Sequence, residues 1–311
     1  MIFMTFQKYK AHLALFGAAV MWGLMSPMGK TALENGLDGI SLATFRMTGG
    51  AICFWLASLF APKEDVKSSD MLLLFFAALL GIVMNQGCFT LGLSLTSPID
   101  ASIVTTTAPI ATMVIAAIFI KEPVTSKKVF GVFLGSIGAL TLIMSHSSTS
   151  AQSGSIIGDL LCLAAQISYA FYLVLFKGLI SRYNIFTLMK WMFTYSAMCF
   201  IPLSYNYVSK IDYSAIPSVT WWCTAYVILC GTFLSNMLVM VGQKNLRPTV
   251  ISMYNYIQPI VGTTVSIILG MGTFGPAKGV AVTLVFLGVY LVTQSKSRAQ
   301  MLAEKENELH S

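Results

Sequence analysis

The chain is a series of long apolar segments separated by short polar connections. A membrane-spanning helix needs about 20 largely apolar residues, and ten windows meet this requirement. They cover residues 11–31, 40–60, 71–93, 98–119, 127–144, 155–176, 185–205, 219–241, 248–270 and 276–294. The predicted fold class is therefore an all-α membrane protein with ten transmembrane helices.

The apolar pattern occurs twice in the chain, as an internal repeat. Residues 92–140 align without a gap to residues 242–290, and the matched positions include Gly92 and Gly242, Pro98 and Pro248, Ser102 and Ser252, Pro109 and Pro259, and Gly138 and Gly288. A repeat of this kind is typical of a transporter built from two related halves. Because five spans is an odd number, the second half must be inserted upside down, which gives two inverted five-helix repeats.

We place the first repeat at residues 11–145, a Ser-rich linker at 146–154, the second repeat at 155–294 and a polar cytoplasmic tail at 295–311. The linker has no Lys, Arg, Asp or Glu and suits a flexible connection between halves.

Lys and Arg are distributed unevenly between the two predicted sides of the membrane. With a cytoplasmic N-terminus, 15 of the 19 lie on the inner side, and the four on the outer side are Lys30, Arg46, Lys210 and Lys278. This excess follows the positive-inside rule. Lys244 and Arg247 of one inner loop are matched by uncharged Ser94 and Ser97 in an outer loop. We therefore expect both termini in the cytoplasm.

Composition agrees with lipid as the solvent. The chain is 56% hydrophobic and only 10% charged, against roughly 25% charged residues in a soluble domain. The net charge of +7 forms no basic stripe, so nucleic acid is not an expected partner. Six cysteines are scattered singly, without C-x-x-C spacing, so we predict no metal, cofactor or disulfide.

Two prolines interrupt matched spans. Pro109 and Pro259 fall near the middle of the fourth and ninth spans, and each removes the helical partner of a carbonyl four residues earlier, at Thr105 and Asn255. In hydrocarbon such a break is tolerated where it lines a cavity or finds another partner. Paired breaks mark binding sites in inverted-repeat transporters; a packing kink is the alternative.

Polar and aromatic side chains from six spans fall at the depth of these breaks. Singly, each is more typical of helix packing than of ligand contact. Together they fit a cavity lined by apolar groups with a few polar anchors. The predicted substrate site consists of Trp22, Asn85, Thr105, Thr106, Tyr169, Tyr172, Asn236, Tyr254, Asn255, Tyr256 and Gln258, with Pro109 and Pro259 as helix breaks.

Charged residues inside or near the spans admit two interpretations. Arg46 and Lys190 lie about two turns into their spans, and we favour snorkelling or a lipid contact over substrate binding. Asp100, Glu122 and Asp159 fall at span ends, where we expect them to be solvated. No acid occupies the middle of a span, which argues against a buried carboxylate proton relay and leaves the coupling ion open.

The chain resembles bacterial EamA-type members of the drug/metabolite transporter superfamily over residues 11–294. The residues that carry the resemblance are Trp22-Gly23 with Lys30, Tyr169-Ala170 with Lys177, Arg46, Ala108-Pro109 with Lys121-Glu122, and Gly131, Gly135 and Gly138. The resemblance implies an inner-membrane carrier, usually an exporter of amino acids or related metabolites, that works by alternating access. Gly272 stands opposite Glu122 and Tyr169 opposite Trp22, so the cavity should be chemically asymmetric.

The sequence thus predicts a secondary transporter of small metabolites in the bilayer. Import instead of export, and a non-transporting sensor or scaffold on a transporter fold, remain alternatives, and a homodimer is compatible with the sequence. No H-E-x-x-H, G-x-S-x-G or Walker motif is present, so an enzyme is the weakest hypothesis.

Overall fold

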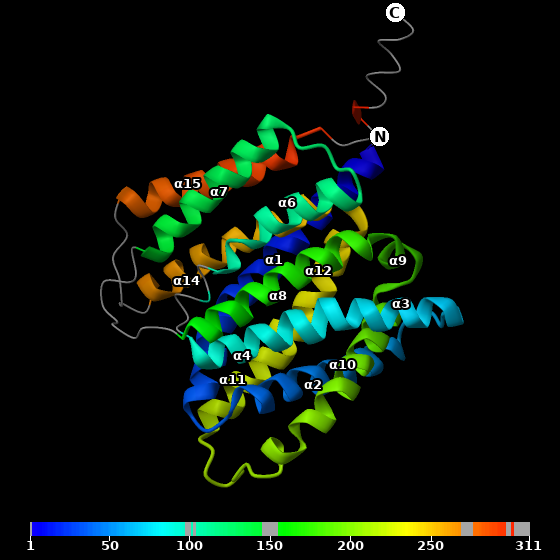
Figure 1. The fold of residues 1–311 in the computed structure, drawn as a ribbon, viewed down its shortest axis with the longest axis vertical. Coiled ribbons are helices and arrows are strands. Elements are labelled where there is room, and N and C mark those ends of the chain that lie inside the picture. Colours follow the sequence, from blue (N-terminus) through cyan, green and yellow to red (C-terminus); the bar gives the residue numbers. More distant parts are fainter. Residues whose placement is uncertain are drawn as a thin grey trace, which may run out of the picture.

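The computed structural model describes residues 2–96, 101, 104–144, 155–268, 276–296 and 300–301, and these form helices joined by short connections (Figure 1). The first half contains α1 (Ile2–Glu34), α2 (Gly39–Ser58), α3 (Ser68–Ala78), η1 (Leu79–Gly87), α4 (Cys88–Leu95), α6 (Ala108–Phe119) and α7 (Ser126–Met144). The second half contains α8 (Ile156–Leu175), α9 (Lys177–Arg182), α10 (Ile185–Val208), α11 (Ser218–Ile228), η3 (Leu229–Leu234), α12 (Ser235–Asn245), α13 (Pro248–Met253), η4 (Tyr254–Tyr256), α14 (Ile257–Ile268) and α15 (Pro276–Thr293).

Among the described residues, five helical stretches are long and apolar enough to cross a membrane. They are Gln7–Glu34, Gly39–Ser58, Ser68–Leu95, Ile156–Leu175 and Ser218–Asn245, and two shorter apolar helices are Ala108–Phe119 and Gly279–Thr293. The chain is therefore an all-helical, multi-pass membrane protein. The count of ten spans stays a prediction, and the linker at 146–154 lies outside the described residues.

Matched helices of the two halves begin in the same way. The side chain of Asp38 accepts hydrogen bonds from the backbone N–H groups of Ile40 and Ser41 at the start of α2. Asn184 accepts from the N–H of Thr187 at the start of α10. Both are N-caps that satisfy donors left open in the first turn, so these helices can be compared position by position from their caps.

The halves pack through a set of helix pairs that is unchanged when the halves are exchanged. The helix α2 packs on its counterpart α10, and α7 packs on its counterpart α15. The helix α1 packs on η3, α12 and α14, while its counterpart α8 packs on the matched segments η1, α4 and α6 (Figure 1). This exchange is the contact pattern of a twofold arrangement.

Small residues allow the closest of these approaches. A Cβ added to Gly288 of α15 would lie 2.5 Å from the carbonyl oxygen of Gly131 in α7. The repeat-related contact is equally tight, because a Cβ on Gly138 would lie 2.6 Å from the carbonyl oxygen of Ala281. Membrane helices pack closely through such small residues, so the repeat in the sequence is also a repeat in packing.

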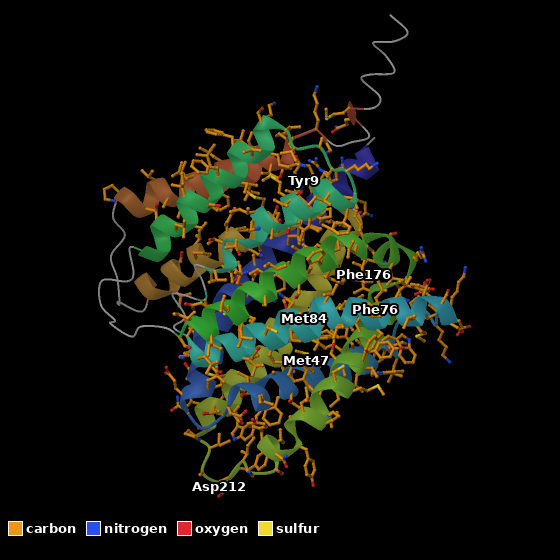
Figure 2. All side chains as sticks on the ribbon, in the orientation of Figure 1. Tyr9, Met47, Phe76, Met84, Phe176 and Asp212 are labelled. Atoms are coloured by element: carbon orange, nitrogen blue, oxygen red, sulfur yellow. The ribbon has the colours of Figure 1, made fainter. Side chains whose placement is uncertain are left out.

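Large apolar side chains cover the flanks of the helices. Phe76 and Met84 lie on the α3–η1 helix and are 45% and 36% exposed (Figure 2). Charged Asp212 instead lies in the loop between α10 and α11 (Figure 2). Apolar side chains on the helix surfaces, with charged residues in the loops at the helix ends, are typical of helices that lie in the hydrocarbon core of a bilayer.

Candidate functional site

Two π-helical segments occupy matched positions. The segment η1 begins at Leu79 and η3 begins at Leu229, 150 positions later in the repeat. The wider turns free carbonyls for other donors. The Ser168 hydroxyl donates to the Leu80 carbonyl at 2.9 Å, and the Trp22 indole N–H donates to the Gly231 carbonyl at 3.2 Å. These segments had no signal in the hydropathy pattern.

Matched interruptions precede the two prolines. In the first half, a turn at residues 106–107 stands directly before α6, in which Pro109 is the second residue. In the second half, the 3-10 turn η4 separates α13 from α14, in which Pro259 is the third residue. Both interruptions therefore lie within one turn of the proline, on its N-terminal side.

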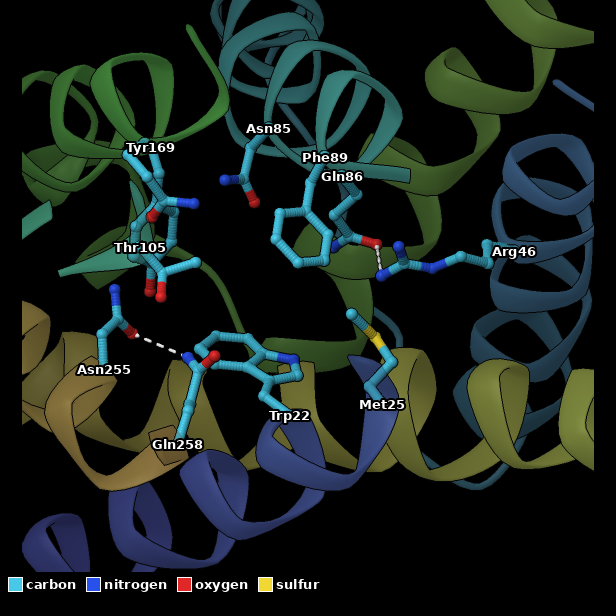
Figure 3. A pocket seen from close by; sticks show the side chains of 11 residues that line it. Trp22, Met25, Arg46, Asn85, Gln86, Phe89, Thr105, Tyr169, Asn255 and Gln258 are labelled. Atoms are coloured by element: carbon cyan, nitrogen blue, oxygen red, sulfur yellow. Dashed lines mark hydrogen bonds between the residues drawn. The ribbon is translucent and has the colours of Figure 1, made fainter. Parts of the chain in front are cut away.

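A cavity lies between the halves next to these interruptions (Figure 3). Its lining comes from α1, α2, η1, α4, α8, η4 and α14 together with the residue before the first turn. The lining residues are Trp22, Met25, Arg46, Asn85, Gln86, Phe89, Thr105, Gln166, Tyr169, Asn255 and Gln258. Thr105 and Asn255, which are matched in the repeat, both line it.

A second cavity adjoins the first and shares four lining residues with it: Trp22, Asn85, Gln86 and Tyr169. Its further walls include Tyr172, Met192, Asn236 and Gln243. The Tyr172 hydroxyl lies 3.1 Å from the Gln243 side-chain oxygen and donates to it. Eight of the eleven predicted site residues therefore line one cavity or the other.

Three predicted site residues line neither cavity. The Tyr256 hydroxyl lies 2.7 Å from that of Ser136, and its ring packs against Gly135 of α7. The Tyr254 hydroxyl lies 2.7 Å from a ring nitrogen of His12. Thr106 is buried beside Thr105 but is not part of either lining.

The polar anchors of the cavity are held in part by their neighbours. The Asn85 amide donates to the Ala165 carbonyl at 3.0 Å, and the Gln258 amide donates to the Asn255 side-chain oxygen at 3.3 Å. The ring of Trp22 meets that of Tyr169 edge-on, with centroids 6.3 Å apart. In the described part of the chain, no group of three His, Cys, Asp or Glu residues could hold a metal ion.

Arg46 is buried, and the snorkelling interpretation is wrong. Its side chain is folded into the protein, with the residue only 2% exposed. The guanidinium donates to the Thr90 hydroxyl at 2.7 Å, to the Gln86 side-chain oxygen at 3.1 Å and to the Thr232 hydroxyl at 3.2 Å. The signal was available in the sequence, because an ionisable residue inside a span is a functional candidate by default.

Lys190 differs from Arg46. Its ammonium nitrogen lies 4.8 Å from the centroid of the Trp55 ring, a cation–π contact. Trp55 is 42% exposed, so this lysine lies at the periphery between α2 and α10. It lines neither of the two central cavities.

Glu122 is also buried, so the expectation of a solvated acid at this position is wrong. It is 6% exposed and accepts hydrogen bonds from Lys128 at 2.9 Å and from the Thr249 hydroxyl at 3.1 Å. Arg247 lies 3.8 Å away; burial lowers the pKa of its guanidinium, and the Glu122 carboxylate partly opposes that shift. The cluster joins the α6–α7 loop of one half to the start of α13 in the other.

Two matched lysines hold the ends of matched helices. Lys30 donates to the carbonyls of Leu93 and Thr96 at the end of α4, at 3.2 and 3.1 Å. Lys177 donates to the Leu246 carbonyl after α12 at 2.6 Å, and Leu246 matches Thr96 in the repeat. A cation at a helix C-terminus satisfies open carbonyls and complements the helix dipole.

Taken together, the described helices form two related halves with a cavity lined by both. Residues 9–144 and 156–294 each match the EamA-like transporter family. The chain belongs to this family, within the drug/metabolite transporter superfamily.

Relatives extend this likeness to bacteria and plants. The chain is 26% identical to the uncharacterized transporter YyaM of Bacillus subtilis over 62% of this chain and 63% of that protein, just under two thirds of its length. It is 19% identical to the uncharacterized transporter YetK of the same organism, over 93% and 86%. It is 26% identical to the WAT1-related protein At2g40900 of Arabidopsis thaliana, over 88% and 75%.

The fold has been seen before in a crystal structure. That structure is 15% identical in sequence, and the comparison gives a TM-score of 0.74 over 92% of this chain and 97% of that one. At this level of identity, the likeness concerns the fold alone.

Proposed function

We propose that this protein is a secondary transporter that carries small metabolites across the membrane by alternating access around the central cavity. The observation that carries the proposal is the convergence of both halves on one lining, with the matched residues Thr105 and Asn255 beside the two helix interruptions. Irregular backbone at membrane depth is tolerated where it lines a cavity, and such sites hold substrates in repeat-built carriers.

The twofold contact pattern supplies a mechanism for alternating access. In an inverted repeat, exchanging the local conformations of the two halves converts an opening on one face into an opening on the other. The α2–α10 and α7–α15 pairs each join equivalent helices, so they are preserved through such an exchange. The substrate stays at the centre while the halves rock around it.

We further propose a bacterial inner-membrane location with both termini in the cytoplasm. The uneven division of Lys and Arg supports this orientation. The N-terminal end of α1 and the α9 segment lie toward the same side of the molecule (Figure 1). The direction we favour is export of amino acids or related compounds, as the family resemblance implies; import is the alternative.

The test is a comparison of metabolites in the medium of bacteria expressing the native chain or Asn255→Ala at matched membrane abundance. Asn255 is 6% exposed and lines the cavity, so losing its amide should weaken substrate binding about tenfold, the effect of a hydrogen bond worth about 1.4 kcal/mol. The matched control is Asn245→Ala, because Asn245 is exposed and, among the described residues, bonds only to Val241 of its own helix. We expect a compound enriched by the native chain and the control, and much less by Asn255→Ala.

Each other outcome changes the proposal in a defined way. Equal enrichment by Asn255→Ala would remove this residue from the site while keeping export. Depletion of a compound from the medium would reverse the direction to import. No change in any compound would contradict transport and favour a sensor or scaffold.

A further inference from the structure

The central cavity contains one formal charge, on Arg46. Its three hydrogen bonds all go to neutral oxygens, and the cavity lining contains no Asp or Glu. No salt bridge of Arg46 is found among the described residues. A buried charge without a counter-charge is expensive within a membrane, so its presence in a binding cavity calls for an anionic ligand.

The guanidinium retains capacity to bind such a ligand. It has five N–H groups, and one bond is made by each of its three nitrogens. One N–H on each terminal nitrogen therefore has no partner within the described structure. Terminal guanidinium nitrogens bind a carboxylate through two parallel hydrogen bonds. The bonds to Gln86, Thr90 and Thr232 fix the position of the group in advance.

The surroundings of Arg46 indicate the rest of the ligand. Phe89 and Met25 flank the guanidinium, and Trp22 lies farther along the same cavity (Figure 3). Gln166 lines the cavity, is 4% exposed and has no hydrogen-bond partner among the described residues. The cavity thus offers a cation, an apolar and aromatic wall, and a spare amide.

We propose that Arg46 binds the carboxylate of the transported solute, and that the cavity selects small organic anions with an apolar part. A cationic solute would meet the guanidinium without any acidic side chain in the lining to offset it. A zwitterionic amino acid would place its ammonium in the same acid-free lining. This inference rests on the proposed transport function and restricts its substrates to related carboxylates without an ammonium group, which excludes the amino acids themselves.

The test uses the purified full-length chain in detergent and measures thermal unfolding against ligand concentration. The probes share a phenyl group and differ in charge: 3-phenylpropanoate, 3-phenylpropanamide, phenylalanine and 2-phenylethylamine. A second series carries an isobutyl group in place of the phenyl group, and sodium chloride tests an inorganic anion. We expect the carboxylates to stabilise the protein at concentrations at least tenfold lower than the matched amide, zwitterion or amine.

Variants assign the effect to Arg46. Arg46→Met should abolish the preference for carboxylate over amide. Arg46→Lys should retain part of it, because an ammonium keeps the charge but cannot donate the two parallel hydrogen bonds of a guanidinium. The matched control is Lys190→Met, which removes a cation from the periphery of the α2–α10 pair, away from both central cavities. This control should leave the preference unchanged. Arg46→Met removes a buried charge but also leaves the Gln86 side-chain oxygen without its donor, so its binding is compared only once its unfolding transition is cooperative; Arg46→Lys, which keeps a donor, supplies the second measurement.

The proposal is overturned if amides or amines bind as well as carboxylates, if chloride binds better than both, or if the preference survives in Arg46→Met. It is also overturned if no carboxylate binds while the native chain changes the level of a neutral or cationic metabolite in the medium. That last result leaves the proposed transport function standing. Conversely, Arg46-dependent carboxylate binding without any change in the medium would contradict transport and keep the anion site.

Discussion

Arg46 and Met192 occupy equivalent positions in the matched helices α2 and α10, but their side chains differ in chemistry. Arg46 lies eight residues after the N-cap Asp38 of α2, and Met192 lies eight residues after the N-cap Asn184 of α10. Both are buried, at 2% and 1% exposure, and each lines one of the two adjoining cavities. One half therefore places a cation where the other places a thioether.

The residues that contact Arg46 also differ from the residues at the matched positions in the other half. Arg46 bonds to oxygens of Gln86, Thr90 and Thr232, and the matched positions in the repeat hold Asn236, Met240 and Ile82. The close glycine contacts between helices, by contrast, are kept in both halves. Gly81 abuts Tyr172, and the matched Gly231 abuts Met25. Close packing constrains size at both places, whereas the polarity of the matched cavity positions differs between the halves.

The largest expected effect comes from placing a second charge at the matched position in the other half. Met192→Arg would bury a second guanidinium near Met240 and Ile82, in a cavity whose lining contains no Asp or Glu and lacks the two threonine hydroxyls that bind Arg46. We expect a loss of about 5 kcal/mol or more, since an uncompensated buried ion costs several kcal/mol. The measurement is membrane abundance together with thermal unfolding, with Met192→Leu as the control for volume. Near-native stability of Met192→Arg would show that the two sides are equivalent.

A second comparison concerns the Glu122 cluster, whose matched position holds Gly272. Glu122→Gln would leave Lys128, which is 1% exposed, without its acid. Breaking a buried pair from one side costs about 3 kcal/mol, and Glu122→Gln combined with Lys128→Met should recover much of that loss. Thermal unfolding of the single and double variants measures the coupling. Additive effects in the double variant would show that the pair does not interact.

The smallest effect tests the symmetry itself. Lys30→Met and Lys177→Met each remove a cation from the end of a matched helix, and we expect similar losses of about 1–2 kcal/mol. Lys210→Met, at an exposed position, controls for the loss of a surface charge. A large loss at one lysine and none at the other would mean that the helix ends are held differently in the two halves.

Several features of the fold and cavity could be predicted from the sequence. Hydropathy located the apolar helices that the structure describes, the repeat related the two halves, and the prolines pointed to the depth of Thr105 and Asn255. Their side chains, with Trp22 and Tyr169, do line one cavity. These signals are local or periodic, so one sequence is enough to read them.

Other features depend on side-chain direction, which hydropathy does not encode. The helix that carries Arg46 is apolar nearly all round, so the pattern did not separate its protein-facing side from its lipid-facing side. In the 3-10 turn η4, successive side chains point about 120° apart. Only Asn255 of its three residues lines the cavity, while Tyr254 and Tyr256 bond elsewhere. The burial of Glu122 depends on Arg247 and Thr249, which are far away in sequence.

The central claim is that one cavity between the halves is reached from both faces of the membrane. Thr105 is the residue to test it, because it lines the cavity beside the first interruption. The variant is Thr105→Cys in a chain whose six native cysteines are replaced by serine or alanine and which is shown to retain transport. A membrane-impermeant maleimide is applied to right-side-out and to inside-out vesicles. Asp212→Cys in the α10–α11 loop is the control for a residue exposed on one face.

We predict that Thr105→Cys reacts in both vesicle orientations, that the transported solute slows both reactions, and that Asp212→Cys reacts in one orientation only. Reaction of Thr105→Cys from a single face, or from neither, in a chain that still transports would contradict alternating access at this cavity.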